Sequence, residues 1–369
     1  MRPDTVIDAD GHITEPELVW TEYTTTDMRD RVLQVVTENG HSSLQVEGHS
    51  RGDQGPGPAE ACIPGGMEPG KSLTWADILP GGYDPQARLD VLDEEGIDKA
   101  LFFPSIHLLW GDIRDVDVSV ETCRAYNNWM SDFCKTNPDR LFGMGIIPMQ
   151  DPDCAAAETA RMAELGLRGV VIRPERFNGL ALYDERCDRI WETAQADDIA
   201  IGIHGSFGSR MKGFSSDRYA DNIFYDHMIA HPFGQMAVMM DVIAGGVLDR
   251  FENLRVGFFE SGLGWIPYWI DRLDEHFEVM GHHTPWLERR PSETFQAQCF
   301  VSMEADEENG LRWMSEKGLL DTVLWGSDYP HFDSTYPGAY TEAQATFDAV
   351  GEDVAGKVVL ANAQRFMGL

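Results

Sequence analysis

Short runs of aliphatic and β-branched residues alternate along the chain with longer stretches whose apolar positions repeat at helical spacing. Eight runs predict buried strands, which begin near Val6, Lys99, Leu141, Gly169, Ile199, Leu254, Phe300 and Thr322. Helices are predicted over 84–95, 119–136, 152–165, 184–197, 232–248, 263–279 and 306–317, with a helical tail over 340–349 and 353–366. This alternation favours an α/β fold, a (β/α)₈ TIM barrel formed by a single domain over 1–369.

One region, 17–82, interrupts the alternation. Two alternating runs flank Asn39-Gly40, which is a hairpin signal, and a Gly/Pro-rich stretch follows over 52–70. We interpret the region as a hairpin and loop inserted after the first strand, at the catalytic face of the barrel. Long loops at such positions often form lids or subunit contacts, so we expect the insertion to cover the site or to take part in a homodimer.

Four of the predicted strands end in a polar motif. The motifs are Asp10-Gly-His12, Gly-Ile-His204-Gly-Ser, Phe-Phe-Glu260-Ser-Gly and Trp-Gly-Ser-Asp328-Tyr-Pro-His331. In a parallel barrel these strand ends converge on one face, and positions i and i+2 of a strand point to the same side. Considered by itself, Asp10 could instead be an aspartate that only caps the turn after the strand. Their joint occurrence instead predicts a divalent metal site.

The composition of the chain limits the binding partners and the cellular compartment that we expect for the protein. The net charge of −33 over 369 residues disfavours nucleic acid and anionic membrane surfaces, whereas a local cation still permits a small anionic substrate. No apolar stretch approaches the roughly 20 residues that span a bilayer, and the N-terminus lacks a signal-peptide run. The six cysteines are scattered without Cys-x-x-Cys spacing, which suits a reducing compartment. We therefore expect a cytoplasmic protein.

The chain resembles the amidohydrolase superfamily, in the branch of metal-dependent decarboxylases and hydrolases related to aminocarboxymuconate-semialdehyde decarboxylase. The resemblance covers nearly the whole chain through IDADGHITEP, GGYDPQARLDVLDEEGIDKALFFPS, RLFGMGIIPMQDP, GLRGVVIRP, IGIHG, WGSDYPH and VVLANAQRFMGL. It implies one divalent ion, Zn²⁺ or Mn²⁺, held by Asp10, His12, His204 and Asp328. The family's sixth strand usually ends in a catalytic His, where this chain has Glu260. That carboxylate could be a further ligand, a general acid or base, or a partner that orients His204.

Further side chains are candidates for substrate binding. Arg173 ends the fourth strand and could hold a carboxylate bidentately, or it could form a structural pair with Glu175. His107 and His331 follow the second and eighth strands and are predicted to line the pocket, and two loop residues, Arg210 and Lys212, are weaker candidates.

A histidine pair, His227 and His231, has the i,i+4 spacing of a helical metal site. However, Pro232 follows directly, and the residue before a proline is disfavoured in a helix. We therefore interpret the pair as structural or pocket-lining.

These observations predict an enzyme. The leading hypothesis is a mononuclear metal-dependent, non-oxidative decarboxylase of a small aromatic or unsaturated carboxylic acid, with Asp328 as proton carrier and Glu260 as a second catalytic residue. The alternative is a metal-dependent hydrolase of a C–N, C–C or lactone bond, in which a metal lowers the pKa of bound water toward about 7. A catalytically inactive binding protein is disfavoured by the intact ligand set.

Overall fold

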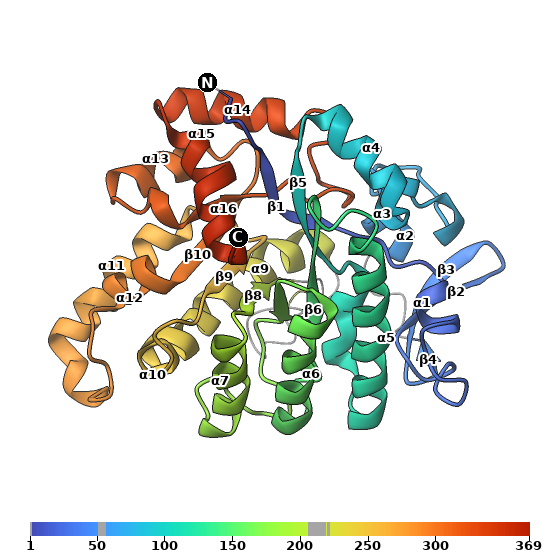
Figure 1. Ribbon diagram of the computed structural model, residues 1–369, viewed down its shortest axis with the longest axis horizontal. Coiled ribbons are helices and arrows are strands. Elements are labelled where there is room, and N and C mark those ends of the chain that lie inside the picture. Colours follow the sequence, from blue (N-terminus) through green and yellow to red (C-terminus); the bar gives the residue numbers. More distant parts are fainter. Residues whose placement is uncertain (1, 51–56, 206–218, 220–221) are drawn as a thin grey trace.

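The computed structural model describes residues 2–50, 57–205, 219 and 222–369, and helices surround a central parallel sheet (Figure 1). The eight strands of this sheet pair in parallel in chain order, so the predicted (β/α)₈ barrel is confirmed. Their bounds are β1 (Ile7–His12), β5 (Lys99–Phe103), β6 (Leu141–Ile146), β7 (Gly169–Ile172), β8 (Ala200–His204), β9 (Val256–Phe259), β10 (Cys299–Met303) and β11 (Val323–Trp325).

The barrel closes where the chain beyond β11 returns to β1. The backbone N–H of Asp328 donates to the carbonyl of Asp10 at 2.9 Å, and that of His12 donates to the carbonyl of Tyr329 at 2.8 Å. Gly326 is required at this contact, because a Cβ there would lie 2.1 Å from the Cβ of Asp10. The first and last strands therefore bring their polar motifs together.

The outer layer consists of helices that follow the strands. The longer ones are α4 (Pro85–Glu95), α5 (Val116–Cys134), α6 (Pro152–Leu165), α7 (Asp188–Ala196), α9 (Ile223–Met239), α11 (Trp265–Met280), α12 (Pro291–Gln298), α13 (Glu308–Glu316) and α14 (Ala339–Val350). Short helices are α1 (Leu18–Thr21), α2 (Pro58–Ala61), α3 (Pro80–Tyr83), α10 (Val247–Arg250), α15 (Val354–Gly356) and α16 (Asn362–Met367). The barrel strands are almost entirely buried, as expected for parallel strands covered by helices. Among the described residues, no helix has both the length and the apolar character needed to cross a bilayer.

One helix differs from its prediction. The pattern placed it over 232–248, but α9 begins at Ile223, runs through Pro232 and continues at Met239 into a π-helical turn. Proline removes one helical hydrogen bond and hinders the preceding turn. Here Asn222 compensates at the N-terminus, since its side chain accepts a hydrogen bond from the backbone N–H of Phe224.

The inserted region forms a small antiparallel sheet of β2 (Gln34–Glu38), β3 (His41–Val46) and β4 (His49–Ser50), seen beside α1 and α5 in Figure 1. Its turn is at Asn39-Gly40, both of which have positive φ. Farther along, the carbonyl of Ala61 accepts from Phe332, and the N–H of Gly65 donates to Phe332. The insertion therefore lies against the loop that follows Asp328.

Candidate metal centre

Three buried side chains from two strands meet at the C-terminal end of the barrel. The Nε2 atoms of His12, on β1, and His204, at the end of β8, are 3.1 Å apart. Oδ1 of Asp10 lies 3.8 Å from Nε2 of His12 and 3.5 Å from Nε2 of His204. The sequence-predicted residues of β1 and β8 thus face a common point.

Hydrogen bonds fix how the two imidazoles face that point. Nδ1 of His12 lies 2.8 Å from the carbonyl of Pro104, and Nδ1 of His204 lies 2.7 Å from the carbonyl of Gly205. A carbonyl only accepts, so each Nδ1 bears the proton and each Nε2 is left to bind what lies between them. Within the described part of the chain, Oδ1 of Asp10 accepts no hydrogen bond. The lone pairs on Nε2 of His12 and Nε2 of His204 and the charge on Oδ1 of Asp10 repel one another at these distances, so a proton or a cation must lie between them.

The pKa shifts point the same way. Burial, followed by the neighbouring His331 and His204, holds the pKa of His12 well below its ordinary value. Burial also acts to lower the pKa of His204, but Asp10 and Glu260 outweigh it and raise that pKa. A proton on His204 is therefore the charge that balances Asp10 in the absence of metal, and metal binding would displace it.

Asp328 and His331 complete one side of the cluster. Oδ1 of Asp328 lies 3.4 Å from Nε2 of His12 and 2.8 Å from Nδ1 of His331. Nε2 of His331 is 2.9 Å from the hydroxyl of Ser105, and its ring lies 3.9 Å from that of His12. Ligand atoms on a tetrahedral ion with bonds of about 2.1 Å are about 3.4 Å apart. The separations among these side chains therefore fit a divalent cation.

Two carboxylates at the site are held on strained backbone. Glu260 and Asp328 have φ of 54° and 55°, in the left-handed region that residues with a side chain rarely adopt. Burial, followed by the charges of Glu260 and Asp333, raises the pKa of Asp328 well above its ordinary value. Burial would also raise the pKa of Glu260, but His231 and His204 outweigh it and hold that pKa low. The surroundings of the site thus favour the protonated form of Asp328 and the ionised form of Glu260.

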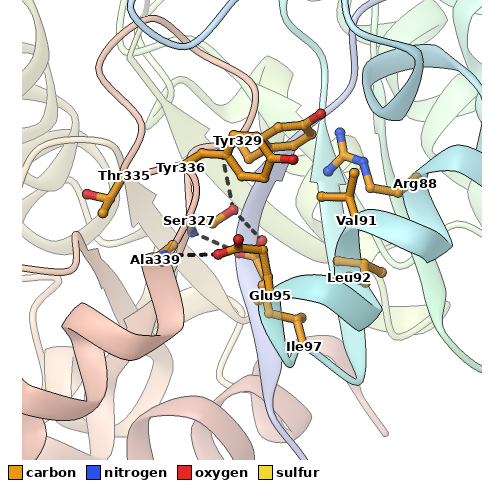
Figure 2. Close-up of a pocket in the computed structure, with 11 residues that line it drawn as sticks. Arg88, Val91, Leu92, Glu95, Ile97, Ser327, Tyr329, Thr335, Tyr336 and Ala339 are labelled. Atoms are coloured by element: carbon orange, nitrogen blue, oxygen red, sulfur yellow. Dashed lines mark hydrogen bonds between the residues drawn. The ribbon is translucent and has the colours of Figure 1, made fainter.

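The turn bearing Asp328 is fixed to β1 beside a small cavity of about 10 Å³ (Figure 2). Asp8 accepts hydrogen bonds from the backbone N–H and hydroxyl of Ser327, at 3.0 and 2.6 Å. Arg88, which lines the cavity, donates to the carbonyl of His12, and its guanidinium lies 4.7 Å from the ring centre of Tyr329. These contacts fix the backbone on both sides of the metal-facing groups.

Sequence reasoning missed Ser302 and gave His231 no more than a structural or pocket-lining role. The hydroxyl of Ser302, on β10, donates to Oδ2 of Asp10 at 2.8 Å and accepts from the backbone N–H of Glu260 at 3.0 Å. His231 places its Nε2 3.4 Å from Oε1 of Glu260. A serine inside the otherwise apolar run Cys-Phe-Val-Ser-Met was the available signal for Ser302, whereas the i,i+4 spacing of His227 and His231 was noted and judged structural or pocket-lining because of Pro232.

Other predicted site residues pair with acids. Arg173 is fully buried, and its guanidinium lies 2.5 Å from Glu175 and 3.7 Å from Asp112. His107 is also buried, with its Nδ1 3.4 Å from Glu15. The structure therefore brings together the predicted metal ligands, Glu260 and His331, and gives Arg173 and His107 acidic partners. The remaining candidates, Arg210 and Lys212, lie outside the described residues.

The chain is similar to known proteins in both sequence and fold. A family model described as Amidohydrolase matches residues 7–369. The chain is 24% identical over 292 residues to 2-amino-3-carboxymuconate-6-semialdehyde decarboxylase of Dictyostelium discoideum, covering 78% of this chain and 77% of the relative.

Two solved structures share the fold. An amidohydrolase of Mycobacterium avium subsp. paratuberculosis K-10 superposes with a TM-score of 0.82, at 20% identity and 99% coverage of both chains. A 5-carboxyvanillate decarboxylase of Novosphingobium aromaticivorans, complexed with manganese and 4-hydroxy-3-methoxy-5-nitrobenzoic acid, superposes with a TM-score of 0.70, at 20% identity and 99% and 96% coverage.

Proposed function

Because the chain belongs to the amidohydrolase family, we propose that it is a metal-dependent, non-oxidative decarboxylase of a small aromatic or unsaturated carboxylic acid. Membership confirms the resemblance found in the sequence and makes the protein an enzyme of this superfamily. The choice of decarboxylation is supported by the Dictyostelium relative and the 5-carboxyvanillate decarboxylase, both named for that reaction.

One divalent ion is proposed at Asp10, His12, His204 and Asp328. The support is the convergence of two Nε2 atoms and two carboxylates, at separations that suit ligands of one cation. Both Zn²⁺ and Mn²⁺ suit imidazole and carboxylate ligands, and manganese is present in the 5-carboxyvanillate decarboxylase complex. When bound, the ion would polarise the substrate carboxylate and a neighbouring oxygen as a Lewis acid.

Asp328 is the proposed proton carrier. Burial and the neighbouring carboxylates raise its pKa, which favours its protonated form before the ion binds, and it lies in contact with His331 and close to His12. In the reaction the bond between the carboxylate carbon and its neighbour breaks, CO₂ leaves, and Asp328 delivers its proton to the electron pair left on that neighbour. The carboxylate of Asp328 then regains a proton from solvent through His331, whose Nδ1 lies 2.8 Å from its Oδ1.

The remaining residues are assigned supporting roles. Glu260, ionised and close to His204, is proposed to offset the positive charge of the site as the proton moves. His331 is proposed to contact the substrate beside Asp328. Binding of a second anionic group by Arg173, with His107 lining the pocket, stays a prediction, since both residues already face carboxylates.

The observation that supports this function most directly is the position of Asp328, whose Oδ1 lies 3.4 Å from an imidazole nitrogen that faces the proposed ion. The test is an assay of the manganese-loaded enzyme in D₂O on 5-carboxyvanillate and other hydroxylated benzoates, with NMR detection of product. We expect release of CO₂ and one deuterium at the carbon that bore the carboxylate.

Asp328→Asn should lower kcat roughly 10²–10⁴-fold, the usual size of a general acid–base contribution, with the metal still bound. The matched control is Asp306→Asn, at an exposed acid beyond β10, which should leave kcat unchanged. Near-native turnover by metal-loaded Asp328→Asn would show the proton assignment to be wrong. Cleavage of amides or lactones, without CO₂ release from any acid, would favour the hydrolase alternative.

A further inference from the structure

A second group of potential metal ligands lies beside the first centre. It consists of His227 and His231, four residues apart on α9, and Glu260 at the end of β9. Residues at i and i+4 lie on one face of a helix, and both imidazoles point their Nε2 toward the same oxygen, Oε1 of Glu260. The distances are 4.0 Å from His227 and 3.4 Å from His231.

These separations suit side chains that bind one metal ion. Charge-assisted N–H···O bonds are about 2.7–2.9 Å long, whereas two ligand atoms on a tetrahedral zinc ion are about 3.4 Å apart. Oδ2 of Asp333, in the loop beyond β11, lies 3.7 Å from Nε2 of His227, at the edge of this group. One ligand atom from each of His227, His231 and Glu260 lies within 4.8 Å of the other two, as the ligands of one ion must.

The surrounding chain orients the His231 ring. Its Nδ1 lies 3.2 Å from the carbonyl of His227, so this nitrogen bears the proton and Nε2 faces Glu260. Gly205 allows the close approach, since a Cβ there would lie 2.1 Å from Cδ2 of His231. His231 therefore packs directly against the residue that follows His204.

We propose that His227, His231 and Glu260 form a second divalent cation site, which binds Zn²⁺ beside the first centre and leaves a fourth coordination position open. Two histidines four apart on a helix, with a glutamate from elsewhere in the chain, are a zinc ligand set of metal-dependent hydrolases. Met228 occupies the position next to the first histidine at which those enzymes place a catalytic glutamate. The inference therefore concerns metal binding, and it transfers no peptidase chemistry.

The second site goes beyond the proposed function and does not depend on it. The two centres meet at Glu260, whose Oε2 lies 3.4 Å from Nδ1 of His204 while Oε1 faces α9. An ion on the α9 side would neutralise a carboxylate next to the first ion's ligand His204. It would also offer a coordination position to an anionic group of a bound substrate.

Zinc stoichiometry tests the site on the full chain. Protein stripped with a chelator is equilibrated with excess ZnCl₂, desalted and analysed by mass spectrometry for zinc per chain. We expect two ions in the native chain, one in His227→Ala/His231→Ala and one in His12→Ala/His204→Ala. The matched control is His282→Ala/His283→Ala, which removes a histidine pair from a short surface helix and should retain two ions.

Each outcome separates the two sites. A single ion that is lost only from the His12/His204 variant would overturn the second site and leave the proposed function intact. A single ion lost only from the His227/His231 variant would support the second site and contradict the first. If the native chain binds no second zinc, His231 and Glu260 form only an ion pair, and the proposal is wrong.

Folding of each variant is checked by circular dichroism. If the double variant does not fold, His227→Gln alone gives the answer, because the His227 side chain is partly exposed and tolerates replacement. Replacing a residue that only supports a metal ligand lowers metal affinity about 10–100-fold. Because His227 is itself a proposed ligand, His227→Gln should lower the affinity for the second zinc by more than that. Unchanged affinity for a second zinc in folded His227→Gln would remove α9 from the site.

Discussion

His204 is the side chain on which the proposed metal site depends most. It is fully buried, its Nδ1 is held by the carbonyl of Gly205, and its Nε2 faces both His12 and Asp10. His204→Ala should therefore remove one equivalent of bound divalent metal, as measured by elemental analysis. His276→Ala, at an exposed histidine on α11, should keep the native metal content. Full metal retention by folded His204→Ala would exclude His204 as a ligand.

Ser302 acts on the site through Asp10. Its hydroxyl donates a hydrogen bond to Oδ2 of Asp10, the oxygen that does not face the histidines. The same hydroxyl accepts a hydrogen bond from the backbone N–H of Glu260. Partners of metal ligands typically contribute 10–100-fold to metal affinity, so Ser302→Ala should raise the Kd for Mn²⁺ by that factor. Titration calorimetry measures it, with Ser315→Ala on α13 as control. An unchanged Kd would mean that Asp10 needs no such support.

At this scale the sequence predicted the charged and imidazole residues at strand ends and missed a neutral one, Ser302, near the end of β10. Asp10, His12 and His204 were found because barrel geometry sends strand ends to one face. Ser302 was missed because one buried serine in an apolar strand has many structural explanations. His231 was given only a structural or pocket-lining role because Pro232 disfavours a helix at that position, whereas α9 runs through Pro232.

At the scale of elements, apolar runs located the strands closely. The predicted start at Lys99 coincides with β5 and that at Leu141 with β6, because these parallel strands are buried on both faces and stand out from their polar surroundings. Helix ends were less well predicted, and α9 begins nine residues before its expected start at 232. Helix boundaries depend on capping and tertiary packing, which a periodic pattern does not record.

The inserted hairpin is the element whose function is most open to test. Arg31, just before β2, pairs with Asp115 at 2.6 Å, and Glu47 accepts from the backbone N–H of Asp115, so the hairpin is tied to the start of α5. Replacing 34–50 by a short Gly-Ser linker should change the assembly state or kcat/KM. Sedimentation velocity and steady-state kinetics measure the two. If both stay native, the insertion has neither a lid role nor a subunit role.

At the scale of the whole molecule, a strongly acidic chain concentrates imidazoles at one end of its barrel. The net charge is −33, yet His12, His204 and His331 lie together there with His231 close by. The same point collects Asp10, Glu260 and Asp328, whose mutual repulsion a cation relieves. The overall charge thus says little about the site, because local groups set its field.

The proposed ligands also connect segments that are far apart in the chain, so metal binding should stabilise the whole barrel. Asp10 and His12 belong to the first strand, His204 to the fifth and Asp328 to the turn after the last. The unfolded chain does not assemble them, so an ion at a free concentration of 100 times its Kd should add about 2.7 kcal/mol to the free energy of unfolding. Chelation should lower Tm accordingly, and returning Mn²⁺ should restore it. His12→Ala/His204→Ala should lose most of this response to Mn²⁺, as measured by calorimetry. An equal Tm with and without metal in the native chain would mean that no ion holds these strand ends together.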